Sequence, residues 1–438
     1  MSKIVWKQEL SIQVLFFFVI VSLYLYYDPF DNNRTIYEDL KWAVERERAK
    51  PIEATERLAG IPSQANLFDD QFTVEEFVTG LDRPTSMTFV GDDLIILEKN
   101  YGKVRLVRDG ILQKEPILDV EVNSLDERGL LGITSIDSHV YLYFTKAEHD
   151  GGPPLGNYIY KYTWDGEQLI DPVLVNSLPS MNPRHNGGSM IVDKNRNVYA
   201  VVGDQTTLYQ PPEKYRILQN VPYGKVDDTG IILRVGIDNS EISPMQSQSP
   251  FDHYYAIGIR NSFGITVDPV TGNLWDTENG EDTFDEVNLV LPKFNSGWVI
   301  TMGPAAPEEF SKIPKLENFT YSDPEFSWER PVAPTGLTFI TSDKFQKYKN
   351  DLLVGDCNNG NIYRFELNQE RTGFVFTDLA LADLVVNTIQ VDGEAKKEPM
   401  DEILFGTGFG CITDLEFGPD DSLYVASISS GAIYRIIQ

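Results

Sequence analysis

The sequence predicts an all-β fold, a six-bladed β-propeller preceded by an N-terminal transmembrane helix and a short helical stalk. Three observations support this prediction. Short aliphatic and aromatic runs, separated by Gly, Asp and Asn turns, fill the chain from about Phe72 onward. Similar runs recur six times along the chain, and one long apolar segment lies near the N-terminus.

The apolar segment Leu10–Tyr27 is just long enough to span a bilayer. Lys3 and Lys7 precede it and Asp28 follows it, which favours a cytoplasmic N-terminus, residues 1–9. No small-residue cleavage site follows the segment, so we expect an uncleaved anchor; a cleaved signal peptide is the alternative. The prediction is a single-pass membrane protein whose propeller is extracytoplasmic.

A stalk is predicted over residues 28–70, between this anchor and the propeller. The stretch Thr35–Lys50 is rich in helix-forming and charged residues, and Pro51 ends it. Residues 71–438 are then expected to form the propeller as one domain.

The repeated unit is a strand, a turn, a second apolar strand and often a third. The units are spaced unevenly, by about 45 to 80 residues. Because a propeller blade is a four-stranded sheet repeated around a channel, six units predict six blades with insertions; a pair of β-sandwiches is the alternative. The second strands are Asp93–Lys99, Val140–Lys146, Asn197–Asp204, Asn273–Gly280, Asp351–Asp356 and Ser422–Ser427.

Charge and cysteine content limit the class of protein. The formal net charge is −29, so we expect no nucleic-acid partner, because that needs a basic patch. Two cysteines, Cys357 and Cys411, are too few for a disulfide framework, although outside the cell they could pair.

A first predicted hairpin, with candidate catalytic residues at the ends of its two strands, spans Arg184–Gln205. Its turn lies near Asp193–Asn197, so the strands fold back and bring His185 beside Asp204. A carboxylate beside a histidine fixes its tautomer and raises its basicity, as a general base requires. The alternative is a histidine that caps a strand end, with Asp204 in a turn.

A second hairpin spans Gly258–Asn288, with its turn near Pro269–Asn273. Arg260 offers a charged, planar donor group that suits an oxygen gaining negative charge. The backbone carbonyls of Gly280 and Glu281 suit a hard cation such as Ca²⁺. The alternatives are an inter-blade salt bridge for Arg260 and a solvated turn for the acidic residues near Gly280 and Glu281. The residues that this hairpin brings together are Arg260, Asn261, Asn279, Gly280 and Glu281.

The ends of these hairpins are expected to meet at one rim of the propeller. Equivalent hairpin ends face the same side of the central channel in such a fold. Glu127 lies at the same end of its own hairpin, so we expect it to join the two sets above.

Seven segments, in order, closely resemble the glucose/sorbosone dehydrogenase family, the soluble-type aldose dehydrogenases that use pyrroloquinoline quinone (PQQ). The resemblance covers roughly residues 72–438 and implies a six-bladed propeller. The segments are GLDRPTSMTF (Gly80–Phe89), DERGLLGI (Asp126–Ile133), RHNGG (Arg184–Gly188), VGDQ (Val202–Gln205), GIRNSFGI (Gly258–Ile265), TENGEDTFDEVNLV (Thr277–Val290) and NSGW (Asn295–Trp298).

The resemblance implies a mechanism. His185 matches the family's base, which takes the proton of the sugar's anomeric hydroxyl while a hydride passes to the quinone and a lactone forms. Asp204 matches the carboxylate that orients this base. Glu127 stands where active members often have glutamine or glutamate.

The resemblance also implies cofactor contacts. Arg260 and Asn261 match residues that hold and polarise the quinone, and Asn279 stands where active members often have glutamine. Gly280 and Glu281 match positions whose backbone carbonyls bind the Ca²⁺ that chelates the cofactor.

In the active members that this chain resembles, basic residues from blades five and six bind the quinone's three carboxylates. The matching position of blade five is Asn358 here, and those of blade six fall near Cys411–Thr413. None of these residues is basic. Each lost charge-assisted bond costs on the order of 1.5–3 kcal/mol. Cys357 and Cys411 lie beside these positions, so we predict a disulfide between them.

Three functions follow from the sequence. The first is a membrane-anchored, quinone-dependent dehydrogenase of an aldose sugar or related polyol, with an electron acceptor that the sequence does not name. The second is a glycan-binding or protein-binding propeller without redox chemistry. The third is a Ca²⁺-dependent lactonase, with oxygen ligands from Glu127, Asn186, Asn279 and Asp204.

Overall fold

The computed structural model describes residues 65–205, 228–235, 251–316, 318–391 and 394–438. The chain divides into residues 1–59 and 60–438, and the description falls within the second unit. The predicted segments 1–9 and 10–27, and nearly all of the predicted stalk, lie outside the described residues.

The predicted fold class needs correction, because it included a transmembrane helix and a helical stalk. Among the described residues, no helix is long and apolar enough to cross a membrane. The helical elements of that part are one α-helical turn and two 3₁₀ turns: α3 (Pro307–Phe310), η4 (Asp343–Tyr348) and η5 (Leu379–Leu381). The described chain is therefore all-β, without the predicted transmembrane helix and helical stalk.

The predicted six-bladed propeller, built from four-stranded units with insertions, is also wrong. The described strands form a propeller from sheets of unequal size: two sheets have four strands, the other large sheets have five or six, and one sheet is a two-stranded ribbon. Some of the extra strands come from segments distant in sequence that pair onto the outer edges, as β1 (Asn66–Leu67) does with β28 (Leu404–Thr407). The hydrophobic pattern of a repeat contains no information about such edge pairing.

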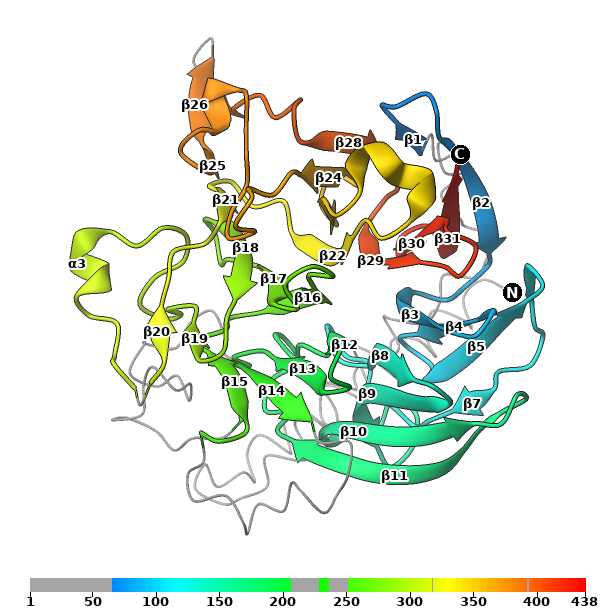
Figure 1. The fold of residues 1–438 in the computed structure, drawn as a ribbon. Helices are drawn as coiled ribbons and strands as arrows, with labels where there is room; N and C mark the ends of the chain where they lie inside the picture. The colour runs from blue at the N-terminus through cyan, green and yellow to red at the C-terminus, as the bar shows by residue number, and fades with distance from the viewer. Residues whose placement is uncertain (1–64, 206–227, 236–250, 317, 392–393) are drawn as a thin grey trace, which may run out of the picture. The chain divides into compact units, whose positions relative to one another are not determined.

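The sheets follow one another around a common centre (Figure 1). The first contains β3 (Pro84–Val90), β4 (Asp93–Glu98), β5 (Lys103–Arg108), β6 (Ile111–Leu112) and β7 (Leu118–Asp119). The next contains β8 (Leu130–Ile136), β9 (His139–Ala147), β10 (Pro154–Trp164) and β11 (Leu169–Leu178).

Two larger sheets carry the hairpins singled out in the sequence. One contains β12 (Met190–Val192), β13 (Val198–Val202), β14 (Ile231–Val235), β15 (Tyr254–Ile257), β19 (Phe294–Asn295) and β20 (Thr320–Tyr321). The other contains β16 (Ser262–Val267), β17 (Leu274–Glu278), β18 (Asp285–Val290), β21 (Phe326–Trp328) and β25 (Val385–Val386).

The remaining strands complete the ring. One sheet contains β1, β28, β24 (Ile362–Phe365), β23 (Leu352–Asp356) and β22 (Pro334–Phe339). Another contains β2 (Thr73–Thr79), β31 (Ala432–Ile437), β30 (Leu423–Ser427) and β29 (Ile412–Phe417). The ribbon is β26 (Thr388–Val391) with β27 (Glu394–Lys397).

Closure of the ring joins the two ends of the described chain. β2 pairs antiparallel with β31, so one sheet takes strands from both ends. β29, the innermost strand of that sheet, also contacts β3 of the first sheet. The ring is therefore closed by backbone hydrogen bonds as well as by packing.

Burial explains why the strands read as apolar runs rather than alternating ones. β13 and β17 are buried at every position, because each of their sheets packs against a neighbour on both faces. The core accordingly consists of clusters between adjacent sheets, such as the one that joins Tyr143 of β9 to Leu233 of β14.

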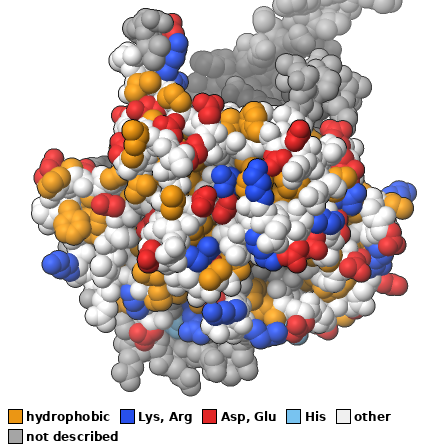
Figure 2. Space-filling view, turned by 45° about the horizontal axis from the view of Figure 1, so that its top comes forward, with side chains coloured by type: hydrophobic (Ala, Val, Ile, Leu, Met, Phe, Trp, Pro, Cys, Tyr) orange, Lys and Arg blue, Asp and Glu red, His pale blue; other side chains and the backbone are white. Residues whose placement is uncertain are grey.

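On the surface in Figure 2, Lys and Arg side chains lie among Asp and Glu side chains.

The predicted disulfide is confirmed, since Cys357 and Cys411 are bonded to each other. Cys357 follows β23 and Cys411 precedes β29, so the bond links two neighbouring sheets near their inner ends.

Opening this disulfide should destabilise the fold. The cysteines are 54 residues apart, and releasing a loop of that size should lower the free energy of unfolding by about 2–4 kcal/mol. Urea denaturation of Cys357→Ser, Cys411→Ser and the double variant measures this. Either single change breaks the bond, so all three should lose similar stability; unchanged unfolding curves would contradict the prediction.

Candidate functional site

His185 and Asp204 lie together, as the hairpin pattern predicts. His185 precedes β12 and Asp204 follows β13, and Val192 pairs with Val198 next to the turn. His185 Nδ1 lies 2.7 Å from Asp204 Oδ1, and the two residues are 6% and 1% exposed. When Asp204 is ionised it accepts from Nδ1–H, which leaves Nε2 as the ring's acceptor atom.

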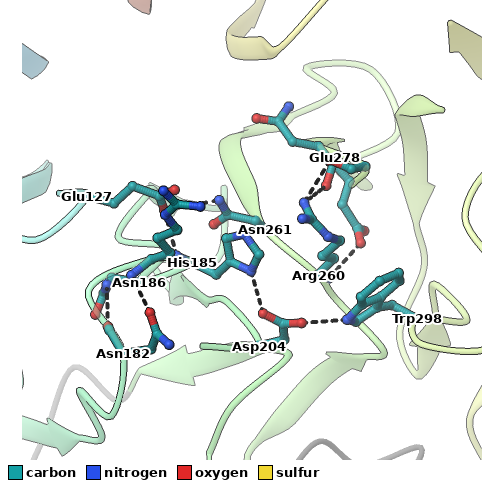
Figure 3. Close-up of polar contacts among 12 residues, drawn as sticks. Glu127, Asn182, His185, Asn186, Asp204, Arg260, Asn261, Glu278 and Trp298 are labelled. Atoms are coloured by element: carbon teal, nitrogen blue, oxygen red, sulfur yellow. Dashed lines mark hydrogen bonds and ion pairs between the residues drawn. The ribbon is translucent and has the colours of Figure 1, made fainter. Parts of the chain in front are cut away.

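Asp204 is held by a third residue, Trp298. Its indole Nε1 donates to Asp204 Oδ2 at 2.5 Å, and the Asp204 backbone N–H donates to the Arg260 carbonyl at 2.8 Å. Each carboxylate oxygen therefore has its own partner, His185 on one and Trp298 on the other (Figure 3). This arrangement fixes the plane of the imidazole.

Arg260 lies beside this group, directly before β16. Its Nη1 donates to the carbonyls of Asn279 and Gly280 at 2.7 and 2.8 Å. Its guanidinium also lies over the Trp298 ring, 5.3 Å from the ring centroid. The side chain, only 4% exposed, is thus positioned by the second hairpin and by the tryptophan that holds Asp204.

Glu127 connects the two hairpins. Its Oε2 accepts from the His185 backbone N–H at 2.6 Å and from Asn261 Nδ2 at 3.2 Å. His185 has a positive φ of 55°, and the bond from its backbone to Glu127 helps to hold that conformation. In this arrangement Glu127 positions the histidine and the asparagine.

A cavity of about 370 Å³ collects the predicted residues. His185 lines it, whereas Asp204 is absent from the lining and lies behind the histidine. The other predicted residues that line it are Glu127, Arg260, Asn261, Asn279, Gly280, Glu281 and Asn358. The structure therefore brings the candidate set together, and the chemical roles assigned to them stay predictions.

Sequence reasoning gave no role to two residues of this site. Trp298 was noticed only as part of the NSGW segment, and its hydrogen bond to Asp204 crosses 94 positions. Glu278 accepts from the Arg260 backbone N–H at 2.6 Å and from Ser296 Oγ at 2.7 Å. No local pattern links Trp298 to a residue 94 positions away. Glu278, by contrast, lies within the second hairpin, where Ser262 pairs with it, so the hairpin register could have placed it beside Arg260.

Four carboxyls on β17 and β18 are buried: Asp285, which lines the cavity, and Asp276, Glu278 and Glu286, which do not. Asn288 Nδ2 donates to both Asp276 and Glu286, at 3.2 Å each. Burial, and then the charge of the neighbouring carboxyls, raise the pKa of Glu278 and Glu286. Burial also raises the pKa of Asp276, partly offset by the bond from Asn288.

These raised pKa values make stability fall as pH rises. Above pH about 4 the unfolded chain has released protons that the folded chain retains, so folding takes up protons. The contribution of these groups to the free energy of unfolding should be greatest below about pH 4, and it should fall as the pH rises from there towards their raised pKa values.

Asp276→Asn should weaken this pH dependence, because it removes one such group. Urea denaturation should show the variant close to the wild type at pH 5 and more stable than it at pH 8. Asp92→Asn, at an exposed turn, is the matched control and should keep the wild-type slope. A wild-type slope in Asp276→Asn would refute the assignment.

The predicted Ca²⁺ site does not fit the observed contacts. The Gly280 carbonyl accepts from the Arg260 guanidinium, and a cation would have to approach that same carbonyl beside a positive charge. Among the described residues, no three His, Cys, Asp or Glu side chains are arranged to hold a metal. In the ligand set of the lactonase hypothesis, Asp204 is held by His185 and Trp298, and Asn186 is bonded to Asn157.

The described residues also do not fit PQQ with its three carboxylates. The basic side chains lining the cavity are Arg184 and Arg260. Arg184 pairs with Asp126 at 2.9 Å, and Arg260 is bonded to two carbonyls. Lys99, considered as a replacement, donates to the Asp126 carbonyl at 2.6 Å and does not line this cavity. The acidic residues of the lining are Asp126, Glu127, Glu281 and Asp285.

Comparison with known proteins identifies the class. Residues 81–435 match the Glucose / Sorbosone dehydrogenase family, and the chain belongs to that family. It is 23% identical to the aldose sugar dehydrogenase YliI of Escherichia coli over 380 residues, 83% of this chain and 92% of that protein. It is 28% identical to quinoprotein glucose dehydrogenase B of Acinetobacter calcoaceticus over 262 residues, 54% of each chain.

Solved structures share the fold. The PQQ-bound aldose sugar dehydrogenase of Streptomyces coelicolor matches with a TM-score of 0.59 at 21% identity, covering 84% of this chain and 98% of that chain. The soluble aldose sugar dehydrogenase of Escherichia coli, in its apo form, matches with a TM-score of 0.61 at 20% identity, covering 84% and 99%. At these identities the likeness concerns the fold alone.

Proposed function

We propose that this protein is a sugar dehydrogenase that oxidises the C1 hydroxyl of an aldose, or a related polyol, to a lactone, with a quinone as the acceptor class. The family and the names of its relatives support a sugar oxidoreductase. The observation that carries the proposal is the buried His185–Asp204–Trp298 group, whose histidine lines a cavity beside Arg260.

His185 is the proton acceptor in this proposal. Asp204 holds the proton on Nδ1, so Nε2 is available to accept the hydroxyl proton of a sugar in the cavity. The imidazolium that results is stabilised by the adjacent carboxylate. Trp298 keeps that carboxylate in plane, which preserves the orientation of the base through the reaction.

Arg260 supports oxygen atoms that gain negative charge. Its guanidinium is fixed by two carbonyls and an indole ring, so it needs little reorganisation during reaction. Removal of the C1 hydrogen with its electron pair needs an acceptor, which a quinone supplies when bound. Because the lining does not fit PQQ, no residue is assigned to that transfer.

His185→Ala should abolish sugar-dependent dye reduction, because general-base catalysis contributes about 10²–10⁴-fold. The fold should survive, since the site lies at strand ends; circular dichroism checks this. His149→Ala, at an exposed position, is the matched histidine control and should keep full activity. Equal activity in the wild type and His185→Ala would refute the proposed base.

A second candidate is ligand binding without redox chemistry. It is favoured by Asn358, which stands where the family resemblance leads one to expect a basic side chain, and by the Cys357–Cys411 disulfide beside such positions. The two candidates differ in whether a quinone binds at all.

Asn358→Lys tests the missing charge directly. Calorimetric titration should show weak PQQ binding to the wild type, and a lysine in the cavity should tighten it by about tenfold or more, because a charge-assisted bond is worth about 1.5–3 kcal/mol. Asn195→Lys, at an exposed turn, is the charge-matched control. No detectable heat in any of the three proteins would favour the non-redox candidate.

An extracytoplasmic location for the described part is also proposed. Disulfides persist in oxidising compartments, and the Cys357–Cys411 bond supports this location. Surface labelling of intact cells with a reagent that does not cross membranes tests it: labelling only after lysis would contradict it.

A further inference from the structure

The backbone that carries His185 has an unusual conformation. His185 has a φ of 55°, and Gly187 and Gly188 have φ values of 67° and 111°. A residue with a side chain keeps a positive φ only where its surroundings impose it. A Cβ at Gly187 would lie 2.5 Å from the Val201 carbonyl oxygen, so this turn packs tightly against β13. The position of the imidazole therefore depends on the contacts that hold residues 185–188.

Asn186, the residue after His185, is fixed through its side chain. It is 0% exposed. Its Oδ1 accepts from Asn157 Nδ2 at 3.0 Å and from Ser180 Oγ at 3.3 Å. Its Nδ2 donates to the Asn182 carbonyl at 3.0 Å (Figure 3). The residue beside the base is therefore held to the loop before it and, through Asn157, to β10.

Asn157 lies on β10 and is also 0% exposed. Its Oδ1 accepts from Thr145 Oγ1 of β9 at 2.7 Å, and its Nδ2 donates to the Pro179 carbonyl at 2.9 Å and to Asn186 Oδ1 at 3.0 Å. An amide offers an acceptor on one side and N–H donors on the other, and Asn157 uses both sides. Tyr143 of β9 also donates its hydroxyl to the Asn186 carbonyl at 2.9 Å. The sheet of β9 and β10 thus holds the residue next to the base.

Asn157 itself faces no space for a ligand. It lines neither the candidate-site cavity nor the cavity of about 510 Å³ in the central channel. On the other side of the base, Glu127 accepts from the His185 backbone N–H at 2.6 Å. The backbone before the imidazole and the residue after it are therefore held by separate contacts, one within the candidate site and one from β10.

We propose that Asn157 is a positioning residue that, through Asn186, holds the His185 imidazole against Asp204. The inference rests on the proposed function only for the role of His185 as the base. Without Asn157, the buried Pro179 carbonyl and Asn186 Oδ1 each lose a donor, which favours rearrangement of the loop. The backbone at His185, which its contacts hold at a positive φ, then relaxes. The ring moves away from Asp204, and the direction of Nε2 towards the cavity changes.

The test is a ¹H NMR measurement on the full-length protein. A proton held between His185 Nδ1 and Asp204 should give a signal far downfield of the backbone amides, and its loss in His185→Ala assigns it. Asn157→Leu keeps the size of the side chain and removes its hydrogen bonds. This change should shift or abolish the signal and speed the exchange of the proton with water. The measurement needs neither a sugar nor an electron acceptor.

Two further variants separate positioning from a loss of stability. Thr145→Val removes only the bond to Asn157 Oδ1, and it should change the signal in the same direction but less. Ser342 follows β22 in another sheet, is 1% exposed, and donates its hydroxyl to the Asp421 carbonyl at 2.8 Å. Ser342→Ala therefore removes a comparable buried bond and should leave the signal unchanged. Circular dichroism checks that each variant is folded.

Kinetics give a second readout. In Asn157→Leu, kcat for sugar oxidation should fall by about tenfold to a hundredfold, because a small displacement of a catalytic group has an effect of that size. KM should stay close to that of the wild type, since Asn157 lines neither cavity. A changed NMR signal in a protein that oxidises no sugar would uphold the positioning role and refute the proposed function.

Three results would overturn the proposal. The first is a wild-type signal with wild-type exchange in folded Asn157→Leu. The second is the same change of signal in Ser342→Ala, because a loss of stability would then account for the effect. The third is the absence of the downfield signal from the wild type, since no proton would then be held between the two side chains.

Discussion

The carboxylate of Asp204 is the constraint on which the candidate site depends. It is almost wholly buried, and its two oxygens are bonded to His185 and Trp298, from segments far apart in the chain. A buried charge is costly unless its hydrogen bonds are satisfied, so the three residues stabilise one another's positions. Arg260 then packs on the same tryptophan, which extends the arrangement to the second hairpin.

The protein buries several acidic groups around this centre. Asp276, Glu278 and Glu286 on β17 and β18 are buried, whereas Asp414 and Glu416 line the central channel and are partly exposed. Several of them have raised pKa values, because burial disfavours the charged form. This acidity distinguishes the chain from what the family resemblance implies, since that resemblance leads one to expect basic residues for an anionic quinone.

Much of the fold and of the site was predictable from local patterns. Strand-turn-strand spacing placed His185 beside Asp204, and Arg260 beside Asn279 and Gly280, because a hairpin's register follows from its turn. The Cys357–Cys411 bond was predicted from the family resemblance, because both cysteines lie beside the positions that the resemblance leads one to expect to be basic. Among the described residues no helix could cross a membrane. The six-bladed architecture was wrongly predicted, because some edge strands come from segments distant in sequence.

The sequence by itself determined the all-β class, the two hairpins and the residue types at their ends, because these depend on turns and on periodicity over a few residues. Only the tertiary structure decided that Trp298 holds Asp204 and that the Arg260 guanidinium donates to the Gly280 carbonyl. Trp298 and Asp204 follow β19 and β13 of one sheet but lie 94 positions apart in the chain. How the sheet brings together strands so distant in sequence is decided by its assembly, and no local pattern encodes that assembly.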